Sequence, residues 1–159
     1  MVLGGGRGNQ LYHSLVLEQQ LLQPSDSVVD SWPFIGGATL TIADLPAREG
    51  VAIERLEAAY HDEVAKLADQ VSDEEIARAK ALITSQWLHH LASVDGRADT
   101  FNEYATLLGD PALVNEALPA ILRVSAEDVK RVVADVMRAD NRVVLTFVPS
   151  ESDEQEAVA

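Results

Sequence analysis

Residues 71–80 read Val-Ser-Asp-Glu-Glu-Ile-Ala-Arg-Ala-Lys and lie between the two longest stretches of helical periodicity in the chain. The hydroxyl of Ser72 can accept a hydrogen bond from the backbone N–H of Glu75, whose carboxylate can reach back to Ser72. This capping box predicts that one helix ends near Val71 and that a second begins at once. The turn therefore joins two long helices.

Apolar residues recur every three or four positions on both sides of this turn, which indicates two amphipathic helices. They are Ile53, Leu56, Tyr60, Val64, Leu67 and Val71 before it, and Ile76, Ile83, Trp87 and Leu91 after it. Pro46 is the predicted start of the first helix. Four further helices are predicted, at residues 9–22, at 97–108 after an interruption at Gly96, at 113–117, and from the capping sequence 125–128 through Val136.

Three short segments have the composition of strands. Residues 27–34 and 38–42 flank Gly36-Gly37 and predict an antiparallel hairpin, and 142–148 (RVVLTFV) form the clearest strand. Helices combined with three strands predict an α+β fold, in which helices cover one face of a small, mainly antiparallel sheet. Three strands make a thin sheet, so we expect residues 1–149 to be one domain that lacks its first strands. Residues 150–159 are predicted to be an acidic, disordered tail.

The charge excludes several classes of partner. Twelve basic residues stand against 26 acidic ones, a net charge of −14. Such a field repels phosphate backbones and anionic membrane surfaces, and it suits a basic peptide or a basic protein surface. No apolar run approaches the roughly 20 residues of a membrane span, and the start lacks the features of a signal peptide. We therefore expect a cytoplasmic protein that binds neither nucleic acid nor membrane.

Metal-binding patterns are missing from the sequence. Its four histidines are His13, His61, His89 and His90. They form neither the His-Glu-x-x-His helix of zinc proteases nor the inverted His-x-x-Glu-His form. Adjacent histidines on a helix point about 100° apart, which disfavours a shared metal. The chain also has no cysteine, so a thiolate site is excluded. We expect no metal ligand in this chain.

No residue stands out as a nucleophile. The chain lacks a Gly-x-Ser-x-Gly elbow, and Ser14, Ser31 and Ser93 have no catalytic context. We therefore expect no catalytic residue. The glycine-rich start at residues 4–8 lacks the lysine of a P-loop, and Asn9 stands where the third glycine of a dinucleotide fingerprint belongs. A structural or substrate-touching loop is the better interpretation.

Several motifs, taken in order, resemble the insulinase, pitrilysin and mitochondrial processing peptidase family of zinc metallopeptidases. Residues 3–12 (LGGGRGNQLY) are similar to its "LGGG-x-x-S-R-L-Y" segment, and 71–80 to its "v-t-x-E-E-l-x-r-a-K" helix start. Leu108-Gly109-Asp110-Pro111 resembles its "G-D-P" stop, and 124–129 (VSAEDV) its "V-T-x-E-D-V". The predicted strand at 142–148 is also similar to the last strand of the family. The resemblance therefore covers nearly all of residues 2–149.

The resemblance implies the second, metal-free domain of such a peptidase. In that family a first domain holds zinc in His-x-x-Glu-His, and two modules close around an unfolded peptide. The expected partners are the zinc-bearing N-terminal domain, a homologous second subunit or a second copy in a homodimer, and a peptide substrate. Gly4, Gly5, Gly6 and Arg7 are the implied substrate loop. Zinc is expected in the full-length parent, with no cofactor in this chain, which alone should be inactive.

One departure from the family leaves two alternatives. Many members carry an Arg and, seven residues later, a Tyr near the end of the first helix, where they stabilise charge on the scissile carbonyl. Val16 and Gln23 occupy those positions here. Either a partner subunit supplies the missing groups, or the chain is a non-catalytic homologue that assembles with an active peptidase. An unrelated acidic helical binding module is a third interpretation.

Overall fold

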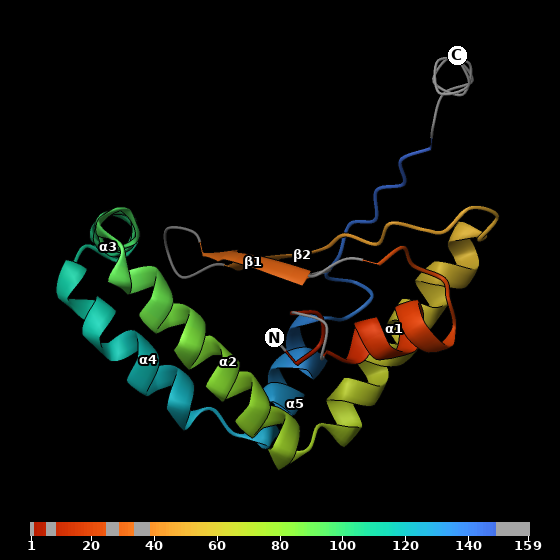
Figure 1. Ribbon diagram of the computed structural model, residues 1–159. Helices are drawn as coiled ribbons and strands as arrows, with labels where there is room; N and C mark the ends of the chain where they lie inside the picture. The colour runs from red at the N-terminus through yellow and green to blue at the C-terminus, as the bar shows by residue number, and fades with distance from the viewer. Residues whose placement is uncertain (1, 6–8, 25–28, 34–38, 149–159) are drawn as a thin grey trace, which may run out of the picture.

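A computed structural model describes residues 2–5, 9–24, 29–33 and 39–148, which form an α+β fold (Figure 1). The elements in chain order are η1 (Tyr12–Glu18), β1 (Val29–Pro33), β2 (Thr39–Ala43), α1 (Ile53–Gln70), α2 (Asp73–Ala92), α3 (Val94–Glu103), η2 (Tyr104–Leu108), η3 (Pro111–Leu113), α4 (Val114–Arg123) and α5 (Ala126–Val136). In the described part of the chain, no helix is long and apolar enough to cross a membrane.

The predicted hairpin is confirmed. Strands β1 and β2 pair antiparallel, with Val29 opposite Ala43 and Trp32 opposite Leu40. Figure 1 shows α2, α4 and α5 below this small sheet, with α3 and α1 near its two ends. Trp32, Leu40 and Ile42 are nevertheless 48%, 47% and 44% exposed, so much of the sheet's apolar surface faces solvent. Among the described strands, β1 and β2 each pair only with the other.

The prediction of a strand at residues 142–148 is wrong. These residues have no regular secondary structure, and the segment, blue in Figure 1, runs away from the helices. Val143 is 85% exposed, Leu145 74% and Phe147 89%. The β-branched composition favours a strand, but a strand also needs a neighbouring backbone to bond with. No such neighbour pairs with it in the described part of the chain.

The hydrophobic core lies where η1 packs against α1 and α5. Leu11, Leu15 and Leu22 are fully buried, and they meet a stripe of α1 and a valine of α5. The contributing residues of these two helices are Leu56, Ala59, Val64, Leu67 and Val133. In Figure 1, α1 and α5 lie side by side, while α2 and α4 form a separate arm that α3 joins at one end.

Two predicted helices are shorter than expected. The helix at 9–22 ends at Glu18, because Gln20 has a positive φ of 54° and the N–H groups of Leu21 and Leu22 turn back to Leu15. The helix predicted from Pro46 begins at Ile53 instead. Residues 46–48 are extended, since they pair with 21–23 through bonds such as that from the N–H of Gln23 to the carbonyl of Pro46 (2.8 Å).

The helices after the turn at Ser72 also differ in their bounds. Gly96, the predicted interruption, lies in the first turn of α3, whose N-cap is Ser93. A Cβ at Gly96 would collide with the carbonyl oxygen of His90, so only glycine allows this close approach. The helix at 113–117 extends to Arg123 as α4 and tolerates Pro119 within it. The stop at Gly109 is confirmed by its left-handed conformation.

Both capping boxes form as the sequence predicts, and they give a test of the fold. In the first, the N–H of Glu75 donates to the hydroxyl of Ser72 (3.2 Å) and the N–H of Ser72 donates to the Glu75 carboxylate (2.9 Å). We expect Ser72→Ala to lower the free energy of unfolding by about 1 kcal/mol. Ser85→Ala, in the exposed middle of α2, is the matched control. Urea denaturation measures both, and equal midpoints for the two variants would contradict the capping role.

Candidate functional site

A buried carboxylate joins η1 to α1. Glu63, on α1, is only 2% exposed. Its Oε1 accepts hydrogen bonds from Ser14 Oγ (2.8 Å) and Lys66 Nζ (2.6 Å), and its Oε2 accepts one from Gln10 Nε2 (3.0 Å). Gln10 also donates to the backbone carbonyl of Glu63 (3.1 Å). The segment before α1 is thereby fixed to that helix by polar contacts within the apolar core.

The hydrogen bonds determine the charge state of this group. Burial raises the pKa of Glu63, but the bonds from Lys66, Ser14 and Gln10 outweigh it and hold the pKa below its ordinary value. The bond to Glu63 in turn raises the pKa of Lys66. The lysine side chain is 53% exposed, so the pair has one buried end and one end in solvent.

Ser14 has a structural role in this arrangement. Its hydroxyl donates to Glu63 and accepts from Gln19 Nε2 (2.9 Å), and the residue is buried. A nucleophilic serine needs a base that is free to take its proton and a route to the substrate. The Glu63 carboxylate is already engaged by a cation and an amide, so this cluster holds η1 in place rather than activating an oxygen.

The predicted substrate loop lies next to the start of the first helix. Gly4 is buried and Gly5 half-buried, while Gly6 and Arg7 lie outside the described residues. The N–H groups of Gln10 and Leu11 donate to the carbonyls of Val2 and Leu3, so the chain before and after the glycines is paired. Asn9 Oδ1 accepts from the N–H of Tyr12 (2.7 Å), so this side chain caps the start of the first helix.

The two positions that depart from the resemblance have plain structural roles. Val16 is 2% exposed within the core, and its carbonyl accepts from Arg48 (3.4 Å). Gln23 is exposed and donates to the carbonyl of Ala47 (2.9 Å). Neither side chain presents a cation or a phenol.

The histidines lie on three different elements: His13 on η1, His61 on α1, and His89 with His90 at the end of α2. Within the described ranges, no three His, Asp or Glu side chains gather in an arrangement that could hold a metal ion. His61 Nδ1 contacts Arg142 (2.7 Å), and Glu57 lies 3.5 Å from both His61 Nε2 and the Arg142 guanidinium. This cluster fastens the start of the 142–148 segment to α1.

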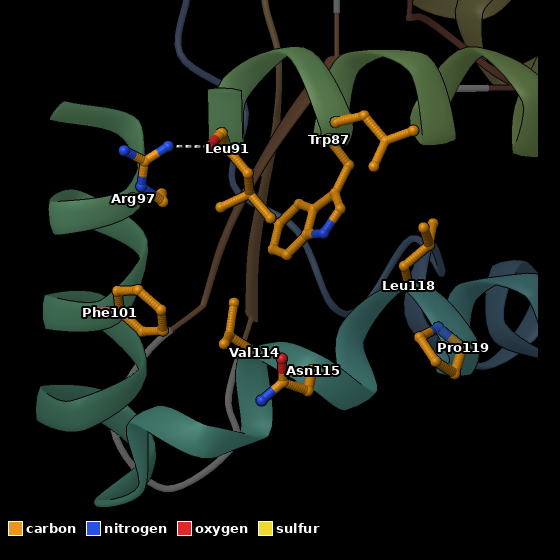
Figure 2. A pocket seen from close by; sticks show the side chains of 9 residues that line it. Trp87, Leu91, Arg97, Phe101, Val114, Asn115, Leu118 and Pro119 are labelled. Carbon is orange, nitrogen blue, oxygen red and sulfur yellow. Dashed lines mark hydrogen bonds between the residues drawn. The ribbon is translucent and has the colours of Figure 1, made fainter. Parts of the chain in front are cut away.

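An apolar hollow of about 270 Å³ lies between α2, α3 and α4. Figure 2 shows Trp87 and Leu91 pointing into it from α2, Phe101 from α3, and Leu118 from α4. The sequence places Trp87 and Leu91 on the apolar stripe of one helix but does not predict the hollow. The hollow could not be predicted from helical spacing, because its lining depends on how three helices pack against one another.

The sequence analysis did not predict the buried contact between Glu63 and Ser14, although the position of Glu63 on its helix gave one indication of it. Glu63 is seven residues after Leu56 and four before Leu67, so it lies on the apolar stripe of α1. A carboxylate at such a position is buried and requires hydrogen-bonding partners. The identity of those partners, 49 and 53 residues away, could not be read from local spacing.

No protein-family model and no curated protein matches the sequence. Solved structures with the same fold do exist. A candidate zinc protease from Bordetella pertussis Tohama I superposes with a TM-score of 0.74 at 18% identity, over 94% of this chain and 81% of that one. A protease from Helicobacter pylori superposes with a TM-score of 0.70 at 18% identity, over 86% of this chain and 32% of that one. This chain thus spans about a third of the Helicobacter protein, and at this identity the likeness is one of fold.

The Glu63 cluster predicts a specific response to acid. The pKa of Glu63 in the folded chain lies below its ordinary value of 4.5. The ionised carboxylate therefore makes its full contribution to the free energy of unfolding above pH 4.5. That contribution is lost as the pH falls through the lower pKa of the folded chain. We expect Glu63→Gln to cost about 2 kcal/mol near neutral pH and to lose less further stability in acid than the unsubstituted chain. Asp69→Asn, an exposed acid on the same helix, is the control. Parallel stability–pH curves for the Glu63 variant and the unsubstituted chain would contradict this account.

Proposed function

We propose that this chain is the metal-free C-terminal domain of a zinc metalloendopeptidase and forms part of the wall of its peptide-binding chamber. The observation that carries the proposal is the shared fold with the candidate zinc protease, which extends over 94% of this chain. The ordered motifs at residues 3–12, 71–80, 108–111 and 124–129 support the same family. Fold likeness alone does not choose among activities, so the proposal depends on the two together.

The exposed apolar surfaces support a partner domain. The segment 143–148 presents Val143, Leu145 and Phe147 to solvent, and the hairpin presents Trp32 and Leu40. Clustered apolar side chains that are exposed to solvent are typical of interaction sites. We assign these surfaces to the zinc-bearing N-terminal domain of the parent, with a homologous subunit or second copy completing the chamber.

The sheet edges support a role in holding peptide. An extended substrate can add to a strand edge through its main chain. Strand β2 pairs with no described strand other than β1, so its outer side is the edge that we assign to this role. Zinc bound by the other domain would supply the activated water for peptide hydrolysis. The residues of this chain would orient the substrate backbone, and none of them is assigned a proton transfer.

The alternative is a non-catalytic homologue that pairs with an active peptidase. Val16 and Gln23 favour it, because neither can stabilise negative charge on a scissile carbonyl. The two proposals differ in where the zinc motif is encoded. A catalytic parent carries His-x-x-Glu-His in its own chain, and a non-catalytic homologue requires it in a separate one.

Expression of the chain together with its flanking and neighbouring coding sequences tests the proposal. We expect His-x-x-Glu-His in the same chain and chelator-sensitive cleavage of an unstructured peptide. Deleting residues 1–149 should lower that cleavage by about 100-fold, because a misplacement of about 1 Å can cost that much in rate. Adding the 159-residue chain in trans should restore it.

A matched pair of variants tests the assigned contact. Leu145→Asp places a charge on a side chain that is 74% exposed, and it should prevent restoration. Thr146→Asp, one residue along the same segment, should restore cleavage as the unsubstituted chain does. Cleavage that survives deletion of 1–149 would overturn the proposal. A zinc motif found only in a separately encoded partner that this chain stimulates would establish the alternative.

A further inference from the structure

We propose that His61 controls the 143–148 segment according to pH. The neutral imidazole holds Arg142, and with it the start of the segment, against α1, and the protonated imidazole releases it. Three side chains take part: His61 and Glu57 of α1, and Arg142 directly before the segment. We call them the His61 cluster. Their side chains are 30%, 39% and 33% exposed, so solvent screens their charges less than it would at an open surface.

The contact between Arg142 and His61 fixes the protonation state of the ring. A guanidinium group has N–H donors and no acceptor, so the ring nitrogen that it meets must accept. Nη1 of Arg142 lies 2.7 Å from Nδ1 of His61. Nδ1 therefore carries no proton, and the ring proton of the neutral histidine lies on Nε2. A protonated imidazole has an N–H at both nitrogens, which would set donor against donor and cation against cation.

The second ring nitrogen gives His61 another partner. Nε2 is buried and has no hydrogen-bond partner among the described residues, and Oε1 of Glu57 lies 3.5 Å from it. The same oxygen lies 3.5 Å from Nη2 of Arg142. Protonation strengthens the attraction of His61 to Glu57, which stands four residues earlier on the helix, the favourable order for an acid and a cation. Arg142 loses its acceptor at the same step.

The apolar side chains beyond Arg142 do little to hold the segment. Val143, Leu145, Phe147 and Val148 are 74–89% exposed, and Val144 is 52% exposed. Side chains that stay in water gain little from burial. Loss of the Arg142 contact therefore frees the start of the segment from α1.

Histidine is the side chain whose charge changes between pH 5 and 8. The Tyr60 ring meets the His61 ring edge-on, at 5.3 Å between centroids. Burial raises the pKa of Tyr60, an effect that the charge of Arg142 reduces, so the phenol stays neutral in this range. The pKa of Glu63 lies below 4.5, so its cluster also keeps its charge. A change between pH 8 and pH 5.5 is therefore not explained by either group.

The other charges near α1 have partners elsewhere. In the described part of the chain, Glu57 is the acidic group within 4 Å of a His61 nitrogen. Asp62 of α1 and Glu18 of η1 both act on Lys66, and Asp135 of α5 is exposed. The remaining charged groups of α5 and the turn after it pair with one another: Lys130 with Glu127 (3.1 Å), Arg131 with Asp128 (3.3 Å) and Arg138 with Asp140 (3.0 Å).

The release bears on a surface that the proposed function assigns to the N-terminal domain. A segment held in one direction binds a partner at a lower entropic cost than a free one. That contact should therefore be favoured while His61 is neutral. This consequence rests on the proposed function, whereas the release itself is tested on this chain alone.

Nuclear magnetic resonance of the full chain labelled with ¹⁵N tests the inference. The ring nitrogen shifts report the tautomer and protonation of His61, and backbone relaxation reports the order of residues 142–148. We expect the ring proton on Nε2 at pH 8. The order parameters of Arg142 and Val143 should then fall from above about 0.6 to below that value at pH 5.5, following the titration of His61.

Matched variants assign the response to this ring. His61→Asn offers an amide oxygen that can accept from Arg142 and does not titrate, so Arg142 and Val143 should stay ordered at both pH values. His61→Phe removes the acceptor, and both residues should be disordered at both pH values. His89→Asn, a change at the end of α2, should leave the response intact. Circular dichroism checks that each variant is folded, and His61→Asn keeps the test decisive if His61→Phe unfolds.

Three results would overturn the inference: equal order of Arg142 and Val143 at pH 8 and pH 5.5, a ring proton on Nδ1 of His61 at pH 8, or a pH response that persists in His61→Asn. None of these measurements uses cleavage or a partner domain. The proposed function can therefore fail while the His61 cluster acts as described, and the reverse also holds.

Discussion

Burial removes the water molecules that would hydrate the Glu63 carboxylate, so the fold must supply hydrogen bonds in their place. Ser14 and Gln10 supply them from the N-terminal segment and Lys66 supplies a charge from the next turn of α1. An unpartnered carboxylate in that position would cost several kcal/mol. The cluster therefore fixes how η1 crosses α1. The buried leucines of η1 and the pairing of residues 21–23 with 46–48 continue the packing that begins at this crossing.

This constraint divides the molecule into two regions with different properties. Around Glu63 the helices share a continuous apolar core. The arm of α2, α3 and α4 shares little of it and encloses a hollow instead, and the hairpin and residues 143–148 keep apolar side chains in solvent. The proposed function uses the exposed regions as the surface for a partner domain. That division agrees with a domain that works as one wall of a larger enzyme.

Much of the fold could be predicted from local patterns because its signals are local. Capping boxes at Ser72 and Ser125, the glycine stop at Gly109 and the hairpin around Gly36-Gly37 each depend on a few adjacent residues. The failures have non-local causes. Residues 46–48 are extended rather than helical because residues 21–23 pair with them. Residues 142–148 form no strand because no neighbouring strand pairs with them in the described chain. The Glu63 cluster and the hollow needed partners from distant segments, which spacing alone does not reveal.

The central claim is that this chain is the half of a zinc peptidase that lacks the metal. Elemental analysis of the 159-residue chain after zinc loading and dialysis tests it most directly, with cleavage of an unstructured peptide followed on the same sample. The account predicts less than about a tenth of an equivalent of zinc, because structural and catalytic sites alike need three or four well-placed ligands, and it predicts no cleavage. Near-stoichiometric zinc with chelator-sensitive cleavage would contradict it and would make ligands of His13, His61, His89 or His90.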